Sequence, residues 1–271
     1  MKRRAGHDLP RPRKRYGQHF LESAWVDKLI DALGAEPTDV FLEIGPGRGA
    51  LTAPLAERVA RVIAIEIDRD LAAALPSRVG SNVSVITGDV LDVDLAELIG
   101  RAPGIARVVG NLPYNVSSAI LFRLLDSAAS GAKLRDATVM LQKEVADRLI
   151  AAPGTKAYGV LAIQAALLAR VERLLSLPPG AFRPPPKVRS AVVRLTFHPP
   201  SVDVGNRDVF QRLVRGVFLQ RRKTMLNALK PVAHALSASA ETLLQRADID
   251  PGRRPETLTV NDFARLSRAV L

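Results

Sequence analysis

The chain has 271 residues, of which 47% are hydrophobic and 24% are charged, and this balance supplies enough apolar residues for a folded core. It contains no cysteine, which excludes disulfide bonds, thiolate metal ligands and a cysteine nucleophile. The net charge of +12 favours polyanions as partners, nucleic acids above all, although a merely soluble basic protein would share this excess.

Residues 1–15, MKRRAGHDLPRPRKR, are basic and almost free of apolar side chains, so we expect a mobile arm, either solvated or in contact with a polyanion. The sequence has no apolar run of the roughly 20 residues that a bilayer-spanning helix needs, and no signal segment opens it. We therefore expect a cytoplasmic protein. We also expect a monomer, because nothing in the pattern suggests a coiled-coil interface.

After the arm, apolar residues at helical spacing predict a helix from Ser23 to Leu33 with Ser23 as its cap. Segments typical of strands and helices then alternate: strand 40–44, helix 51–60, strand 61–68, helix 70–79, strands 83–89 and 106–111, a helix near 117–127, and strand 137–144. Such alternation predicts an α/β fold, with a parallel sheet covered by helices on both faces.

The last third of the chain has a different pattern. Residues 159–177 are typical of a helix that runs into a strand, 178–188 of a proline-rich loop, and 190–197 of a β-branched strand. From residue 209 onward the pattern is helical. We therefore expect three parts: the arm 1–15, an α/β domain over 16–200 and a helical domain over 201–271.

A glycine-rich turn follows the strand 40–44 and opens the next helix. Gly45 and Gly47 let the backbone turn sharply and approach a ligand, with a helix N-terminus behind them. Together with Ala50 they satisfy the dinucleotide pattern G-x-G-x-x-G/A. Glu66, at the end of the next strand, is placed to accept hydrogen bonds from both ribose hydroxyls of an adenosine.

Asp89 is a second carboxylate at the same edge of the predicted sheet, where it could accept from an adenine amino group. Two alternatives stay open: Asp89 caps a helix, or Asp68 rather than Glu66 binds the ribose. NAD and S-adenosylmethionine (SAM) both carry an adenosine, so these features alone do not separate the two cofactors.

The fourth strand ends in Asn-Leu-Pro-Tyr, residues 111–114, at the sheet edge where ligands of open α/β sheets bind. An adenine amino group is a poor nucleophile because its lone pair is delocalised into the ring. The Asn111 side-chain oxygen and the Leu112 carbonyl can accept its two N–H groups and free that lone pair. Pro113 restricts Leu112 to an extended conformation, and Tyr114 offers a flat face for the base. In isolation, the same stretch would also suit a simple turn.

Several motifs resemble those of the KsgA-type small-subunit ribosomal RNA adenine N6,N6-dimethyltransferases, from about Arg13 to the last helix. They are RKRYGQHFL, EIGPGRGALT, IEIDRDL, GDVLD, GNLPYNVSSAILF, LQKEVADRL, KAYGVL, AFRPPPKVRSAVVRL and FLQRRKTMLNAL. The resemblance implies a Rossmann-like SAM-dependent methyltransferase with a small helical C-terminal domain. It also implies dimethylation of two adjacent adenosines near the 3′ end of small-subunit (16S) ribosomal RNA, linked to maturation of that subunit.

The resemblance also implies the site residues. The family's SAM site falls on His19, Leu21, Gly45, Glu66, Asp89 and Asn111. Its catalytic loop falls on Asn111, Leu112, Pro113 and Tyr114, and its second aromatic residue for the target base falls on Phe182. Many relatives carry Asn in place of His19, and both side chains can hydrogen-bond the methionine end of SAM. We expect no metal, because His19 has no clustered partners.

Arg221, Arg222 and Lys223 lie on a predicted helix within 209–229, and we expect them to contact RNA phosphates unless that helix is merely solvated. The alternatives are a large-subunit RNA methyltransferase of the macrolide-resistance type, a non-catalytic ribosome assembly factor and an NAD oxidoreductase. Leu112 favours the small-subunit enzyme, and the intact site residues argue against loss of activity. An NAD enzyme would leave the charge of +12 unexplained.

Overall fold

The computed structural model describes Arg13, residues 18–100, Ala102 and residues 104–270. The predicted arm, 1–15, lies outside the described residues except for Arg13. The chain forms two compact units, Met1–Ala146 with Glu172–Phe197 and Asp147–Val171 with His198–Leu271. Compared with the predicted boundary near residue 200, the chain leaves the first unit after Ala146, returns at Glu172 and leaves again after Phe197.

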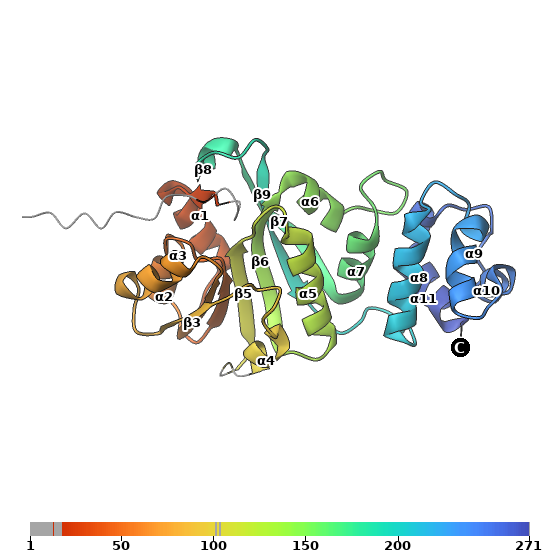
Figure 1. Cartoon of the computed structure of the whole chain (residues 1–271), viewed down its shortest axis with the longest axis horizontal. Coiled ribbons are helices and arrows are strands. Elements are labelled where there is room, and N and C mark those ends of the chain that lie inside the picture. Colours follow the sequence, from red (N-terminus) through yellow and green to blue (C-terminus); the bar gives the residue numbers. More distant parts are fainter. Residues whose placement is uncertain (1–12, 14–17, 101, 103, 271) are drawn as a thin grey trace, which may run out of the picture. The chain divides into compact units, whose positions relative to one another are not determined.

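The main sheet has seven strands in the order β4-β3-β2-β5-β6-β9-β7 (Figure 1). In chain order the strands are β2 (Val40–Ile44), β3 (Arg61–Glu66), β4 (Val83–Thr87), β5 (Ala106–Asn111), β6 (Leu134–Gln142), β7 (Ala169–Leu177) and β9 (Ser190–Phe197). The first five strands pair in parallel, whereas β9 runs antiparallel to β6. This arrangement confirms the predicted Rossmann-like α/β fold and adds an antiparallel strand to the expected parallel sheet.

The order of the strands reverses at β2, because β3 and β4 follow on one side of it, whereas β5 and β6 lie on the other. Strands β2 and β5 pair in register from Val40 with Ala106 to Ile44 with Gly110, so their carboxyl ends lie next to each other. Ligands of open α/β sheets bind at such a switch point.

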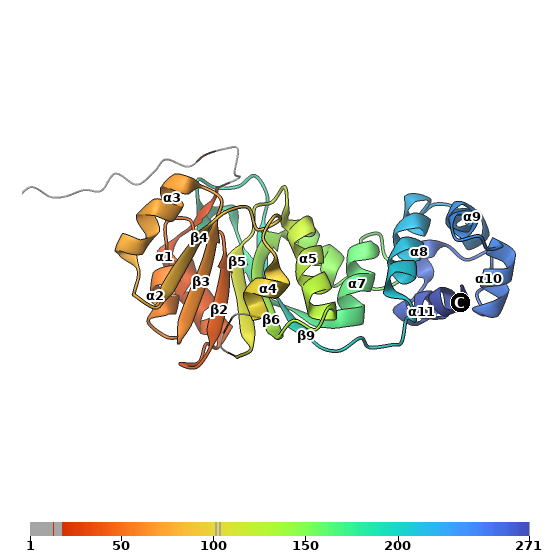
Figure 2. The same ribbon diagram turned by 60° about the horizontal axis from the view of Figure 1, so that its bottom comes forward.

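Helices lie on both sides of the main sheet (Figure 2). They are α1 (Ser23–Leu33), α2 (Thr52–Ala56), α3 (Arg69–Ala74), α4 (Leu95–Gly100), α5 (Ser117–Ala129) and α6 (Lys143–Leu149). Leu29 of α1 and Leu55 of α2 pack with Phe41 of β2 in the hydrophobic core. A separate two-stranded sheet pairs β1 (Phe20–Leu21) with β8 (Phe182–Arg183), which follows the 3₁₀ helix η3 (Pro179–Ala181).

Local details of three predicted helices are wrong. Helix α1 has the predicted bounds, but Glu22 rather than Ser23 occupies the cap position, and no side-chain hydrogen bond caps the helix. The predicted helix 51–60 ends at Ala56, and the predicted helix 70–79 divides into α3 and the 3₁₀ helix η2 (Leu75–Arg78). Pro76 at the start of η2 has no N–H group, which interrupts the α-helical hydrogen bonds.

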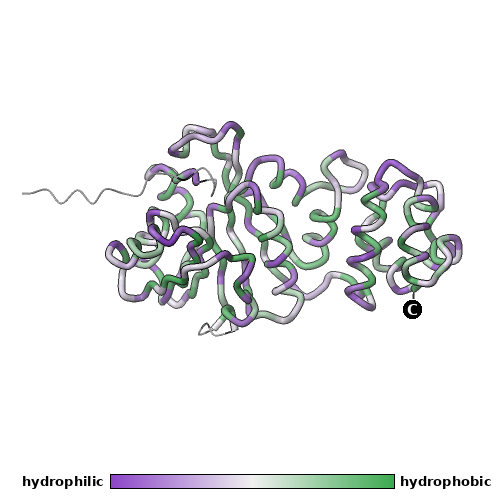
Figure 3. Tube along the Cα trace, in the orientation of Figure 1, coloured by the Kyte–Doolittle hydropathy of each residue, from purple (hydrophilic) through white to green (hydrophobic). Residues whose placement is uncertain are grey.

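The second unit is helical. It contains α7 (Val160–Leu168), α8 (Arg207–Leu219), α9 (Met225–Ala235), α10 (Ala240–Arg246), η4 (Pro255–Thr257) and α11 (Val260–Arg268). The Asn206 side chain caps α8, and a capping box at Thr259 begins α11. Within residues 198–270 the described chain forms no strand, as predicted. Hydrophobic and hydrophilic residues alternate along these helices, as a helix with one buried face requires (Figure 3).

The predicted helix through Gln220-Arg221-Arg222-Lys223 is wrong. Helix α8 ends at Leu219, and residues 220–224 form a turn before α9 begins at Met225. Contacts from distant residues of the same unit hold this turn: the Met225 N–H donates to the Arg253 carbonyl at 2.6 Å, and Arg221 forms an ion pair with Glu256.

Candidate active site

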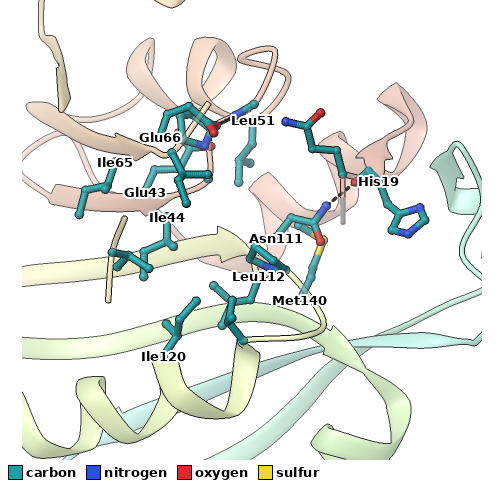
Figure 4. A pocket seen from close by; sticks show the side chains of 18 of the residues that line it. His19, Glu43, Ile44, Leu51, Ile65, Glu66, Asn111, Leu112, Ile120 and Met140 are labelled. Atoms are coloured by element: carbon teal, nitrogen blue, oxygen red, sulfur yellow. Dashed lines mark hydrogen bonds between the residues drawn. The ribbon is translucent and has the colours of Figure 1, made fainter. Parts of the chain in front are cut away.

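A pocket opens in the first unit at the carboxyl ends of the adjacent strands β2, β3 and β5 and beside the loop after β4, where the strand order reverses (Figure 4). Its walls come from the N-terminal segment, the glycine loop, the ends of these strands and the loop after β5. The lining residues are Gln18–Leu21, Glu43–Arg48, Ala50, Leu51, Ile65–Ile67, Gly88–Val90, Asn111–Val116, Ile120 and Met140. The structure therefore brings together all the predicted cofactor residues.

Two glycines allow the backbone segments of this pocket to lie close together. Gly47 has a φ of +58°, and a Cβ atom there would lie 2.9 Å from the Phe20 ring. At Gly110 of β5 a Cβ atom would lie 2.5 Å from the Ile44 carbonyl oxygen of β2. A side chain at either position would therefore displace a wall of the pocket.

Glu66 ties the glycine loop to the end of β3. Its Oε2 accepts a hydrogen bond from the Gly47 N–H, and its Oε1 accepts one from the Asp68 N–H, both at 2.9 Å. Burial raises the pKa of Glu66 above its usual value, and these two N–H donors oppose that effect. Each oxygen keeps a lone pair that a ribose hydroxyl can use, because a carboxylate oxygen accepts two hydrogen bonds.

The two alternatives for the acidic residues have different outcomes. Asp68 is fully buried, caps α3 by accepting from the Asp70 N–H, and pairs with Arg13; it is not among the pocket residues. This placement favours Glu66 over Asp68 as the ribose ligand. Asp89 lines the pocket, and its Oδ1 also accepts from the Leu91 N–H at 2.9 Å, so it stabilises its own turn as well.

The loop after β5 places Asn111 and Leu112 at the pocket. The Asn111 Nδ2 donates to the His19 backbone carbonyl at 2.6 Å, and no described residue donates to its Oδ1. Leu112 is 1% exposed, and its N–H donates to the Met140 carbonyl at 3.2 Å. The amide oxygen of Asn111 is therefore available as an acceptor for a ligand.

Tyr114 is held at both its hydroxyl and its ring. Its hydroxyl forms a 2.6 Å hydrogen bond with the Ser190 hydroxyl, and its ring stacks on the His19 imidazole with centroids 5.5 Å apart. Burial raises the pKa of Tyr114, so the phenol stays protonated at neutral pH. The His19 Nδ1 lies 2.7 Å from the Pro184 carbonyl oxygen, a contact that joins the proline-rich loop to the same cluster.

This geometry can be compared with known proteins. The model of the ribosomal RNA adenine dimethylase family matches residues 10–269. The chain belongs to this family. It is 42% identical over 262 residues to ribosomal RNA small subunit methyltransferase A of Syntrophotalea carbinolica, across 96% of this chain and 97% of that protein. The protein of the same name from Pseudomonas fluorescens is 45% identical over 264 residues, across 95% of this chain and 93% of that one.

Solved structures agree with this assignment. A dimethyladenosine transferase from Plasmodium falciparum has a TM-score of 0.77 at 28% identity and covers 92% of this dimethylase and 96% of its own chain. The 23S rRNA methyltransferase ErmE has a TM-score of 0.63 at 24% identity, covering 93% and 99%, which shows a shared fold alone. The predicted family, Rossmann-like fold, methyltransferase activity and SAM cofactor are thereby confirmed.

The pocket of this dimethylase fits SAM. An adenosine requires an acceptor for its ribose and a backbone that approaches closely, and Glu66 and the loop at Gly47 provide both. The described residues include no group of three His, Asp or Glu side chains that could bind a metal. None of the described helices has the length and apolar character that crossing a bilayer requires.

The structure does not bring Phe182 into the pocket. Phe182 is 1% exposed and packs in the hydrophobic core with residues such as Leu177 and Val192. It pairs instead with Leu21 across the two-stranded sheet, and Leu21 does line the pocket. In this structure the ring of Phe182 therefore supports the pocket wall rather than facing Tyr114.

Sequence reasoning missed Glu43. This side chain is 2% exposed in the middle of β2, lines the pocket and has an Oε2 atom with no hydrogen-bond partner among the described residues. Burial raises the pKa of Glu43 to about 7, and the nearby charge of Glu66 acts in the same direction. A carboxyl group inside the apolar strand VFLEI was the available signal, since buried charges need a reason.

The cations expected to bind RNA differ from one another. The Arg221 guanidinium is occupied within the second unit, because Nε pairs with Glu256 and an NH2 group donates to the Thr155 carbonyl at 3.0 Å. Arg222 and Lys223, by contrast, are exposed at the turn after α8.

Proposed function

We propose that this dimethylase converts two adjacent adenosines near the 3′ end of small-subunit (16S) ribosomal RNA to N6,N6-dimethyladenosine, in a step linked to small-subunit maturation. The observation that carries the proposal is the loop Asn111–Tyr114 at the SAM pocket, with the Asn111 amide oxygen available as an acceptor. Relatives named after the small subunit, 42–45% identical along nearly their whole length, support this choice of substrate.

The chemistry follows from the acceptors on this loop. When bound, SAM supplies an electrophilic methyl group for in-line transfer to the target amine. The Asn111 Oδ1 and the Leu112 carbonyl accept the N–H groups of the adenine amine, which draws its nitrogen toward tetrahedral geometry and frees the lone pair. No general base is needed, because the amine becomes acidic only as the methyl group arrives, and its proton then leaves to water.

The pocket residues divide the binding of the cofactor. Glu66 accepts from the ribose hydroxyls, Asp89 accepts from the adenine amino group, and Gly45 and Gly47 admit the cofactor close to the backbone. His19, Leu21 and Asn111 line the same pocket at the N-terminal segment and the loop after β5. Their position is consistent with contacts to the methionine part of SAM.

The target base leaves its stack to enter the pocket, as bases do in base-modifying enzymes generally. Tyr114 offers its ring for stacking, and Ser190 and His19 hold this ring in place. The role of Phe182 as a second stacking residue stays a prediction, since it requires the ring to leave the core.

RNA binding extends beyond the pocket. Arg222 and Lys223 contact RNA phosphates, an assignment supported by their exposure and by the net charge of +12. Arg221 was predicted to share this role, but its ion pair with Glu256 makes it a support of the turn that carries the other two. The enzyme acts as a monomer in the cytoplasm, where ribosomal subunits mature.

The large-subunit alternative has less support, because ErmE shares only the fold with this chain. The test is to incubate the protein and SAM with small-subunit particles that lack the modification, and then to map dimethyladenosine in their RNA by mass spectrometry. Two adjacent dimethylated adenosines near the 3′ end are expected. Modification elsewhere, or of large-subunit RNA instead, would refute the assignment.

A further inference from the structure

His19 contacts both side chains of the catalytic loop, one through its backbone and one through its ring. The Asn111 Nδ2 donates to the His19 carbonyl oxygen at 2.6 Å (Figure 4), and the imidazole stacks on Tyr114 with 23° between the planes. The ring nitrogen Nδ1 is 2.7 Å from the Pro184 carbonyl oxygen. His19 is thus held at three points in the pocket wall, and its carbonyl has a defined position.

The contact between His19 and Asn111 determines which way the amide faces. A backbone carbonyl oxygen can only accept a hydrogen bond, so the Asn111 atom that meets it must be the amide nitrogen. The amide group is planar, and its oxygen therefore occupies the other branch. That oxygen receives no hydrogen bond from any described residue, which leaves it for the target amine.

Acceptor strength alone does not explain why an asparagine occupies this position. A carboxylate would also accept from an adenine amine, and charged acceptors form stronger hydrogen bonds than neutral ones. A carboxylate at position 111, however, has no proton to donate to the His19 carbonyl. Two oxygen atoms at 2.6 Å without a proton between them repel each other, so the carboxylate would turn away from the productive orientation.

We propose that His19 is a positioning residue whose backbone carbonyl selects an amide over a carboxylate at position 111 and directs the amide oxygen toward the target amine. Stacking on Tyr114 and the contact with Pro184 keep this carbonyl in place. The inference rests on the proposed function in one respect, namely that an adenine amine is the group that the amide oxygen receives.

The decisive variant is N111D, because its carboxyl group can be switched by protonation. At about pH 8 it is ionised, and we expect a single-turnover rate about a hundredfold below that of the parent with SAM and RNA saturating, the scale of a misplaced reacting group. Protonation restores a hydroxyl donor for His19 and a carbonyl acceptor for the amine. The rate relative to the parent should therefore rise about tenfold per pH unit as the pH falls toward the pKa of the new carboxyl.

Two variants and one spectrum serve as controls. N111A has neither donor nor acceptor, so its rate relative to the parent should not vary with pH. H19A keeps the backbone carbonyl and loses only the ring, so it should show no such rise either. Independently of activity, the side-chain NH2 group of Asn111 in the ¹⁵N-asparagine-labelled parent, assigned by its loss in N111A, should include one proton that exchanges slowly with solvent.

Each outcome decides the inference. A rising relative rate of N111D at low pH together with a protected amide proton supports it. N111D as active as the parent at about pH 8, a relative rate that is flat or falls as the pH falls, or an unprotected amide proton would overturn it. If the parent methylates no ribosomal RNA, the proposed function fails instead, and the amide spectrum alone then decides the role of His19.

Discussion

Replacing Glu66 by alanine should weaken SAM binding by about 1.5–3 kcal/mol, which corresponds to about 10- to 150-fold in Kd. The structure shows two sources of this loss. Glu66 accepts the Gly47 and Asp68 N–H groups at 2.9 Å each, so its removal frees the glycine loop from the end of β3. Its remaining lone pairs are those proposed for the ribose. Because Glu66 is only 4% exposed, water replaces these contacts poorly.

Isothermal titration of the folded variant with SAM measures this effect, and Asp68→Asn is the matched control. Asp68 caps α3 and pairs with Arg13 but does not line the pocket. Its substitution should lower the unfolding free energy by about 1 kcal/mol and leave the Kd for SAM within about threefold. Undiminished SAM affinity in folded Glu66→Ala would remove Glu66 from the site, and a large loss in Asp68→Asn would assign the ribose to Asp68.

Four further predictions follow from the same structure. Asn111→Ala should leave RNA affinity nearly intact and lower the single-turnover rate more than tenfold, because the amide acts mainly on the reacting amine. Neutralising Arg222 and Lys223 should weaken binding to small-subunit particles and flatten its salt dependence by about one unit of slope per phosphate contact, in titrations at several salt concentrations. Phe182→Leu should lower the unfolding free energy by about 1 kcal/mol or more in urea, with an unchanged KM for RNA. Burial raises the pKa of Glu43 from 4.5 to about 7, so the folded state keeps a proton that the unfolded chain loses. Stability should therefore fall between about pH 4.5 and pH 7, by up to about 1.4 kcal/mol per unit, and Glu43→Gln should remove most of this fall in urea unfolding.

Each of these predictions has an outcome that contradicts it. Full single-turnover activity of Asn111→Ala would exclude the acceptor role. Unchanged affinity and salt slope after the double neutralisation would mean that RNA binds elsewhere. A raised KM with full stability in Phe182→Leu would restore Phe182 as a stacking residue. The same pH dependence of stability in Glu43→Gln and the parent would show that Glu43 is ionised in the folded protein.

The parts of the fold that depend on local patterns could be predicted. Buried strands such as Val40–Ile44 show as apolar runs, and a glycine turn followed by a helix shows as Gly45 and Gly47. Because parallel strands end at one edge, the positions of Glu66 and Asn111 at the ends of two such strands predict that they lie near each other, and both line the pocket.

The features that depend on distant contacts could not be predicted. No glycine or proline marks the end of α8 at Leu219, because that end depends on contacts with Arg253 and Glu256 from another part of the chain. The inward position of Phe182 depends on its pairing with Leu21, more than 150 residues away in sequence. The contact between His19 and Asn111 also joins two distant segments through a backbone atom, which residue types do not reveal.

The most direct test of the central claim is methyl transfer from labelled SAM to separated small and large ribosomal subunits that lack the modification. The account predicts label in small-subunit RNA, with two methyl groups on each of two adjacent adenosines, and none in large-subunit RNA. Label in the large subunit alone, or no transfer to either particle by a protein that binds SAM, would contradict it.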